Sequence, residues 1–216
     1  MFVATIISII TCIILSVLYW YFYIKPSKTG TYKDYKLSLI NSTTKFTNDY
    51  NKSYPISTLI TDRKKFIVPG KGNGITIVLD LYINNIPMNA SWGSSYRRSK
   101  PILQIGESPC IYYIPRTGEL SLVMKYRDNP YYSNYPEIKL NDIKLQKWNK
   151  YIFVIDNRNV RIYLNGNIIK SRTLDGVPIL YDSEILLGEL NNNFNGKVRQ
   201  LDIYPLPVNP NDISNL

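Results

Sequence analysis

Short segments in which apolar and polar residues alternate recur along most of this chain, with Gly-, Pro- and Asn-rich turns between them. In ITIVLDLYI (75–83), the apolar residues at 75, 77, 79 and 81 share one face of an extended strand. The pattern contains no convincing amphipathic helix, so it predicts an all-β, antiparallel sandwich or barrel. The predicted strands are 35–40, 64–68, 75–83, 101–106, 110–114, 120–126, 148–156, 184–190 and 197–204, with a hairpin over 160–174.

The hairpin is predicted from VRIYLNGNIIKSRTL (160–174), where Asn165 and Gly166 suit the positive φ angles of a two-residue type I′ turn. This turn fixes the register of the two strands. The predicted pairs are Leu164 with Asn167, Tyr163 with Ile168, Ile162 with Ile169, and Arg161 with Lys170. Ile162, Leu164 and Ile169 then share one face, and Arg161, Tyr163 and Lys170 share the other.

Residues 2–24 hold no charged side chain and end in an aromatic run. Their length matches the roughly 20 residues of a membrane-crossing helix. A cleaved signal peptide is disfavoured because no Lys or Arg precedes the run, and a buried core helix would rarely run this long without a polar face. Residues 1–24 are therefore predicted to be a single N-terminal transmembrane α-helix in the lipid bilayer, and the polar residues 25–55 a basic linker or stalk.

Lysines follow this segment and none precedes it, so the positive-inside rule predicts that the C-terminal domain faces the cytoplasm. The glycosylation sequons at Asn41, Asn51 and Asn89 favour the opposite side, although a chain this rich in Asn, Ser and Thr contains such matches by chance. We expect a single-pass membrane protein with a cytoplasmic domain.

Five segments resemble the concanavalin A-like, laminin G-type jelly roll, over residues 56–216. They are "ITIVLDLYI", "LQKWNKYIFVID", "VRIYLNGNIIKSRTLDGVPI", "EILLGEL" and "FNGKVRQLDIYPLPVNPNDI". The resemblance implies a two-sheet jelly-roll sandwich, and it gives scaffold roles to its recognisable positions, which are Trp148, Asn165, Gly166, Gly188, Phe194 and Gly196. In the tail, Asn209 is expected to cap a short helical turn that starts at Pro210.

Several kinds of chemistry are excluded by composition. The chain has no histidine, which removes Ser-His-Asp, Cys-His and His-ligated zinc mechanisms. It also lacks the E-x-D-x-x-E motif of the glycan hydrolases in the resembled superfamily. Glu184 and Glu189 are five residues apart and would point to opposite faces, while Asp156 and Asp202 are expected to stand alone at strand ends or on outer faces. We predict no enzymatic activity, no cofactor and no metal.

Two loops carry candidate binding residues. DNPYYSNYPE (128–137) offers aromatic rings and polar groups for a sugar or a metal, and its candidates are Asp128, Asn129, Tyr131, Tyr132, Asn134 and Tyr135. SWGSSYRRSK (91–100) has the aromatic-plus-arginine composition of protein interfaces, and its candidates are Trp92, Tyr96, Arg97 and Arg98. The formal charge of +10 is spread without a nucleic-acid-binding motif, so we expect contact with acidic surfaces and no specific nucleic acid.

The function expected from these features is that of a non-enzymatic, membrane-anchored structural protein whose loops bind other proteins. The combination resembles virion membrane proteins of large DNA viruses, which implies that the domain ties an internal virion membrane to capsid components. The alternative is a membrane-bound, lectin-like module that recognises glycan through its rim loops and faces outward.

Overall fold

The computed structural model describes residues 36–47, 50–54, 74–84, 99–126, 135–141, 143–180, 184–190 and 194–216. Within these ranges, no helix has the length and apolar character that crossing a bilayer requires. The anchor expected at residues 2–24 and the strand expected at 64–68 lie outside the described residues, so both stay predictions.

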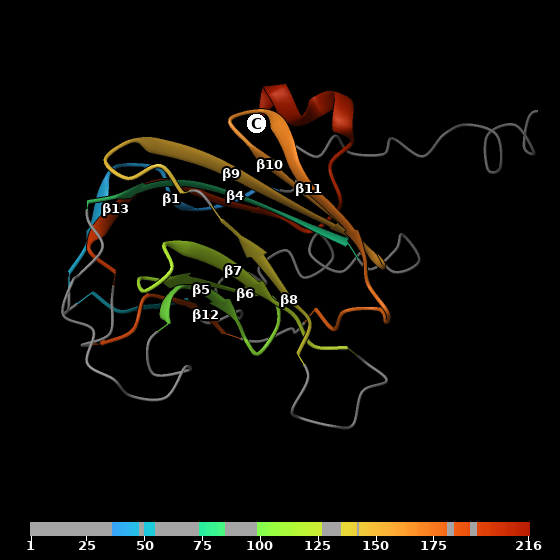
Figure 1. The fold of residues 1–216 in the computed structure, drawn as a ribbon, viewed down its shortest axis with the longest axis horizontal. Helices are drawn as coiled ribbons and strands as arrows, with labels where there is room; N and C mark the ends of the chain where they lie inside the picture. Colours follow the sequence, from blue (N-terminus) through green and yellow to red (C-terminus); the bar gives the residue numbers. More distant parts are fainter. Residues whose placement is uncertain are drawn as a thin grey trace, which may run out of the picture. The chain divides into compact units, whose positions relative to one another are not determined.

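The described strands form two antiparallel sheets that lie one above the other (Figure 1). Sheet A has the order β1–β13–β4–β9–β10–β11, with β2 also paired to β13, and sheet B has the order β3–β12–β5–β6–β7–β8. The bounds in sheet A are β1 Leu37–Ile40, β2 Thr44–Phe46, β4 Gly74–Ile83, β9 Trp148–Asp156, β10 Asn159–Leu164, β11 Asn167–Thr173 and β13 Gly196–Tyr204. Those in sheet B are β3 Lys52–Tyr54, β5 Lys100–Ile105, β6 Cys110–Ile114, β7 Glu119–Val123, β8 Glu137–Leu140 and β12 Ile185–Leu187. The all-β, two-sheet prediction is confirmed.

The core lies between the sheets and follows the alternation in the sequence. In β4, Ile77, Leu79 and Leu81 are fully buried and belong to the core cluster. Phe153 on β9 and Leu120 on β7 reach the same core from the neighbouring strand and from the other sheet. Because alternate residues of a strand point to opposite faces, the residues between them on β4 lie on the outer face of sheet A.

The sandwich begins earlier than the sequence indicated. β1, β2 and β3 fall within residues 25–55, the predicted linker, yet β1 and β2 pair with β13 and β3 pairs with β12. Residues 35–216 form one compact unit. The linker boundary at residue 55 is therefore corrected. β1 falls within the strand predicted at 35–40, whereas β2 and β3 are too short and too polar to stand out in the sequence.

The hairpin turn forms as predicted, with φ of 50° at Asn165 and 86° at Gly166. Leu164 pairs with Asn167 and Tyr163 with Ile168, but a bulge then shifts the register by one residue, so that Ile162 pairs with Lys170. The predicted pairs of Ile162 with Ile169 and of Arg161 with Lys170 are therefore wrong.

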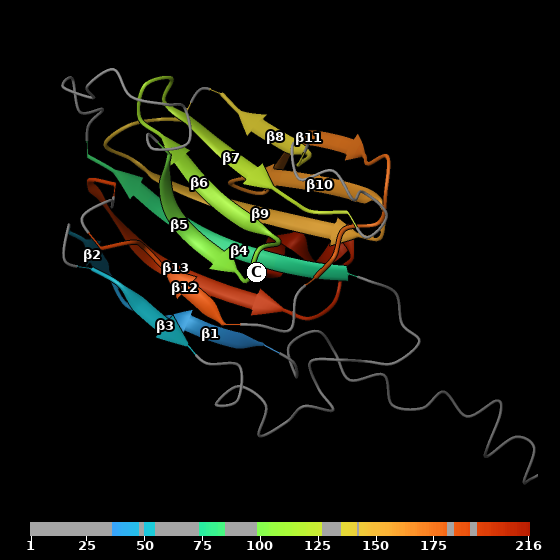
Figure 2. The same ribbon diagram turned by 90° about the horizontal axis from the view of Figure 1, so that it is seen from below.

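The bulge changes which side chains of β11 face inward. Lys170 and Arg172 take the inward positions and donate to the backbone carbonyls of Lys139 and Glu137 on β8, the strand beside β11 in Figure 2. Ile169 is 43% exposed and does not share a face with Ile162, so the predicted grouping of these two residues is also wrong. A one-residue shift in register moves each side chain to the opposite face of the strand. Here the shift places Lys170 and Arg172 where they link β11 to β8.

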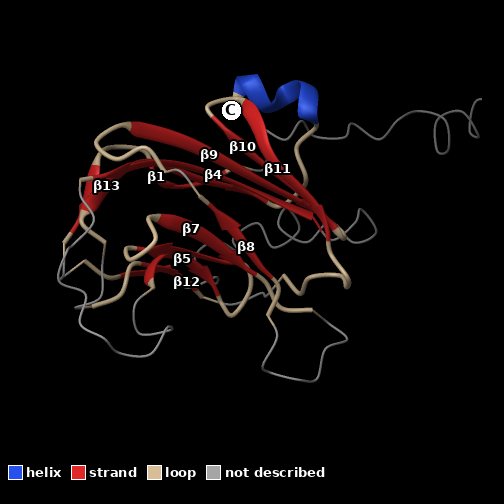
Figure 3. Ribbon diagram, in the orientation of Figure 1, coloured by secondary structure: helices blue, strands red, loops and turns tan. Residues whose placement is uncertain are grey.

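The C-terminal segment covers part of sheet A from outside. A 3-10 helix, η5 (Pro210–Asn215), lies on the side of sheet A away from sheet B (Figure 3). Its predicted cap is confirmed, because the Asn209 side chain accepts a hydrogen bond from the backbone N–H of Asn211. Val208 and Ile213 are buried, and the Thr76 hydroxyl bridges this segment to β4. Elsewhere on this face, around Asp80 and Trp148, a pocket opens.

Candidate functional site

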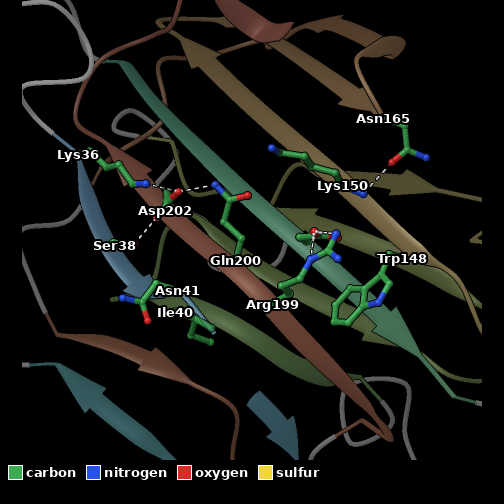
Figure 4. Close-up of a pocket in the computed structure, with 11 residues that line it drawn as sticks. Lys36, Ser38, Ile40, Asn41, Trp148, Lys150, Asn165, Arg199, Gln200 and Asp202 are labelled. Carbon is green, nitrogen blue, oxygen red and sulfur yellow. Dashed lines mark hydrogen bonds and ion pairs between the residues drawn. The ribbon is translucent and has the colours of Figure 1, made fainter. Parts of the chain in front are cut away.

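The uncovered part of the outer face of sheet A holds a pocket of about 570 Å³ that opens to solvent (Figure 4). We call it the outer-face pocket. Its side chains come from β1, β13, β4 and β9 and from the hairpin turn, strands that lie far apart in the sequence. The lining residues are Lys36, Ser38, Ile40, Asn41, Asp80, Trp148, Lys150, Asn165, Arg199, Gln200 and Asp202.

Strand alternation explains why polar groups gather here. Asp80 lies between the core residues Leu79 and Leu81 of β4, so it points to the outer face. On β13 the register shifts between Val198 and Gln200, which leaves Arg199 as the extra residue of a β-bulge. A bulge re-aims the side chains beside it, and here both Arg199 and Gln200 line the pocket.

Asp80, Arg199 and Trp148 form the centre of the pocket. Nε and Nη2 of Arg199 donate to Oδ2 of Asp80 at 2.8 and 2.5 Å. The same guanidinium lies 4.5 Å from the centroid of the Trp148 ring, a cation–π contact that Figure 4 shows. The Asp80 side chain is 5% exposed, and its Oδ1 has no hydrogen-bond partner among the described residues. This oxygen is a buried acceptor without a donor among these residues, and a ligand donor reaches it only if the Asp80 side chain turns toward the pocket.

Asp202, the other acid of the pocket, already has partners for both oxygens. Its Oδ1 accepts from the Ser38 hydroxyl at 2.6 Å, and its Oδ2 accepts from Gln200 Nε2 at 2.6 Å and from Lys36 Nζ at 2.9 Å. The side chain is fully buried. Asp202 therefore joins β1 to β13 and leaves no oxygen for a ligand.

The arrangement suits binding better than hydrolysis. Sequence reasoning placed Asp202 on an outer face, which is confirmed, but expected it to stand alone, whereas it shares the pocket with Asp80. Each of these carboxylates is paired with a cation, Arg199 or Lys36. A glycosidase needs one carboxyl group as a proton donor and another as base or nucleophile, whereas both oxygens of Asp202 already accept hydrogen bonds or ion pairs from the protein.

Most of the binding residues expected from the sequence cannot be placed. The 91–100 candidates Trp92, Tyr96, Arg97 and Arg98 lie outside the described residues, as do Asp128, Asn129, Tyr131, Tyr132 and Asn134. Tyr135 is described and half-buried just before β8, and it does not line the outer-face pocket. Within the described ranges, no group of three His, Cys, Asp or Glu side chains is placed to hold a metal ion.

No binding role was predicted from the sequence for three central residues of the pocket. Asp80 carries the only charge in ITIVLDLYI, and that isolated charge on a strand was the available signal. Trp148 was given a scaffold role only, yet it also lines the pocket. Arg199 gave no signal because its position depends on the bulge.

Two antiparallel sheets around one core, with a polar pocket on an outer face, define a lectin-like β-sandwich. The family model described as the concanavalin A-like lectin/glucanases superfamily (Laminin_G_3) matches residues 91–214. This match covers more than half of the chain, and the chain belongs to that superfamily. No curated protein is similar to it in sequence at a significant level.

Solved structures with the same fold include the binding domains of botulinum neurotoxins and of one other bacterial protein. That of botulinum neurotoxin mosaic serotype C/D is 12% identical with a TM-score of 0.60, over 83% of this chain and 43% of its own. The binding domain of botulinum neurotoxin DC, solved in complex with rat synaptotagmin II, is 14% identical with a TM-score of 0.56, over 83% and 44%. That of Paraclostridial Mosquitocidal Protein 1 is 15% identical with a TM-score of 0.50, over 66% and 36%. This chain thus spans less than half the length of each, and the likeness is one of fold.

Proposed function

We propose that this chain is a non-catalytic binding module that recognises a glycan in the outer-face pocket. The observation that carries the proposal is Oδ1 of Asp80, a buried carboxylate oxygen with no donor among the described residues. An unsatisfied buried acceptor costs about 1–3 kcal/mol, and a sugar hydroxyl that donates to it removes this cost. Trp148 adds an apolar surface beside it, and Asn41, Asn165 and Gln200 add amide groups.

The family membership supports this proposal, because its description names lectins. The proposed site differs from the rim loops that sequence reasoning favoured, since it lies on the face of sheet A. The absence of catalysis is part of the proposal, and it is supported by the cation pairing of Asp80 and Asp202.

A protein partner is the second candidate, and strand β11 favours it. All seven of its residues are exposed, and Ile168 and Ile169 are 55% and 43% exposed. On the side away from β10, β11 has no strand partner among the described residues. An exposed edge strand of this kind can take up an extended segment of another protein by β-augmentation.

The membrane anchor at residues 2–24 and its orientation are proposals that the sequence alone supports. So is a role in tying an internal virion membrane to a capsid shell. Protease protection on intact membranes tests the orientation: a C-terminal domain that resists external protease until the membrane is opened supports the cytoplasmic side, and one that is cut at once contradicts it.

A glycan array probed with the full chain in detergent micelles tests the proposed function. We expect at least one glycan to bind, and we expect Asp80→Asn to weaken that binding about tenfold, because a neutral acceptor forms a weaker hydrogen bond than a carboxylate. Asp156→Asn is the matched control, since Asp156 lies on β9 outside the pocket and is 41% exposed. An array without binders, or equal losses in both variants, would contradict the proposal.

A further inference from the structure

Two lysines face each other beside the outer-face pocket. Lys45 on β2 and Lys197 on β13 are direct partners in the antiparallel register. Phe46 and Val198, which follow them in sequence, belong to the core, so both lysines point to the outer face. Like charges directly opposite on neighbouring strands are destabilising. Neither lysine has an ion pair with an acid in the described part of the chain.

The pair continues into a row across sheet A. Lys197 is the partner of Tyr82 on β4, and Tyr82 is the partner of Trp148 on β9. Lys197 Nζ lies 5.5 Å from the centroid of the Tyr82 ring, and the Tyr82 and Trp148 rings are 5.4 Å apart. Arg199 covers Trp148. We call Lys45, Lys197, Tyr82, Trp148 and Arg199 the cationic row; it crosses three interstrand steps, roughly 14 Å.

The charges of the row are unbalanced. Three of its members are cations, and Asp80, which lies two residues from Tyr82 on β4, is already paired with Arg199. Among the described residues, no acid pairs with Lys45 or Lys197 at the end of the row away from Trp148. Since repulsion between these two lysines opposes folding of this edge, a bound anion would relieve it.

From this geometry we infer that the ligand is an acidic glycan, whose carboxylate or sulfate binds Lys45 and Lys197 while a hydroxyl donates to Asp80. The inference rests on the proposed function and adds the charge class of the glycan. Asp80 decides against a polyphosphate such as a nucleic acid, because its buried carboxylate needs a donor and repels phosphate. The half-buried ring of Tyr82 lies across from Lys197 and two residues along β4 from Asp80, and the half-buried ring of Trp148 flanks it on β9, so both rings offer a surface on which a sugar ring can pack.

The test compares two oligosaccharides of equal length by calorimetric titration of the full chain in detergent micelles. The acidic probe is a hyaluronan hexasaccharide, and the neutral probe is a hexamer of N-acetylglucosamine. We expect the acidic probe to bind about tenfold more tightly, and the Lys45→Gln/Lys197→Gln variant to lose this preference while its affinity for the neutral probe stays unchanged. Lys52→Gln/Lys139→Gln, with both changes on sheet B, removes the same charge and should keep the preference.

The outcomes separate the two proposals. If the neutral probe binds as tightly as the acidic one, or if the sheet B variant loses as much as the Lys45/Lys197 variant, the acidic-glycan inference fails and the glycan-binding proposal stands. If neither probe binds although a glycan of the array does, the acidic-glycan inference fails and the glycan-binding proposal stands; if the array shows no binder either, both fail. A polyglutamate control decides between a glycan site and simple charge attraction: binding as tight as that of the hexasaccharide would overturn the inference.

Discussion

Loss of Arg199 should destabilise the domain far more than neutralisation of its partner Asp80. Arg199→Ala removes two charge-assisted hydrogen bonds and leaves a carboxylate that is 5% exposed without its cation. Removing one partner of a fully buried ion pair costs about 3–5 kcal/mol. Because the Arg199 side chain is 51% exposed, water can partly replace it, which reduces the cost. With the cation–π contact to Trp148, worth about 0.5–1 kcal/mol, we expect a total loss of about 3 kcal/mol.

Asp80→Asn should cost only about 1 kcal/mol, because the amide keeps a hydrogen-bond acceptor and the half-exposed Arg199 stays hydrated. The double variant should be more stable than Arg199→Ala alone, since it no longer buries an unpaired charge.

Urea unfolding of the full chain in detergent, followed by circular dichroism, measures these differences in the free energy of unfolding. In thermal unfolding, the melting temperature of Arg199→Ala should fall by about 6–12 °C. Arg199→Lys is the control that keeps the charge and loses the planar fork. If Arg199→Ala proved no less stable than Asp80→Asn, the role assigned to this pair in the pocket would be wrong.

Three further predictions concern the scaffold. Burial raises the pKa of Cys110 from 9.0 to about 11, and burial together with Tyr54 raises that of Tyr50 from 10.0 to about 12. The unfolded chain loses these protons first, so the free energy of unfolding should fall as the pH rises from about 9 to about 12; denaturation midpoints that stay constant between about pH 8 and about pH 11 would contradict this. Ile162→Ala should lower the free energy of unfolding by about 2–5 kcal/mol, whereas Ile169→Ala, at an exposed position, should lower it by less than about 0.5 kcal/mol. Equal losses in chemical denaturation would indicate that the hairpin has the register without the bulge. Gly196→Ala should cost about 2 kcal/mol, because the added methyl group would overlap the Tyr82 carbonyl oxygen and the Phe194 ring; an unchanged melting temperature would show that this close approach is absent.

The sequence predicts the long strands because burial of one face imposes a period of two on β4, β9 and β13. The Asn-Gly turn and the capped C-terminal helix are predicted for a similar reason, since each depends on residues that are neighbours in the chain. β2 and β3 were missed because three-residue polar strands carry no periodic signal. The exposure of β11 was missed because the bulge before Tyr163 leaves no mark in the composition.

The candidate site depends on contacts that cross the sheet. Asp80 and Arg199 are 119 residues apart, and only the pairing of β4 with β13 brings them together. The Lys45–Lys197 pair depends likewise on β2, a strand that the sequence did not reveal. Loops rich in Tyr and Arg attract attention in a sequence, whereas a single acid on an apolar strand becomes informative once its neighbours across the sheet are known.

The position of the ligand tests the account most directly, and tryptophan provides the probe. The chain contains Trp20, Trp92 and Trp148, so fluorine NMR of the full chain labelled with 5-fluorotryptophan separates the sheet-face pocket from the 91–100 loop. Replacement of each tryptophan by phenylalanine assigns the three signals. On titration with the tightest-binding glycan of the array, we predict a saturable shift of the Trp148 signal while those of Trp20 and Trp92 stay in place. A shift of the Trp92 signal with Trp148 unmoved would contradict the account and place the binding site on the loop.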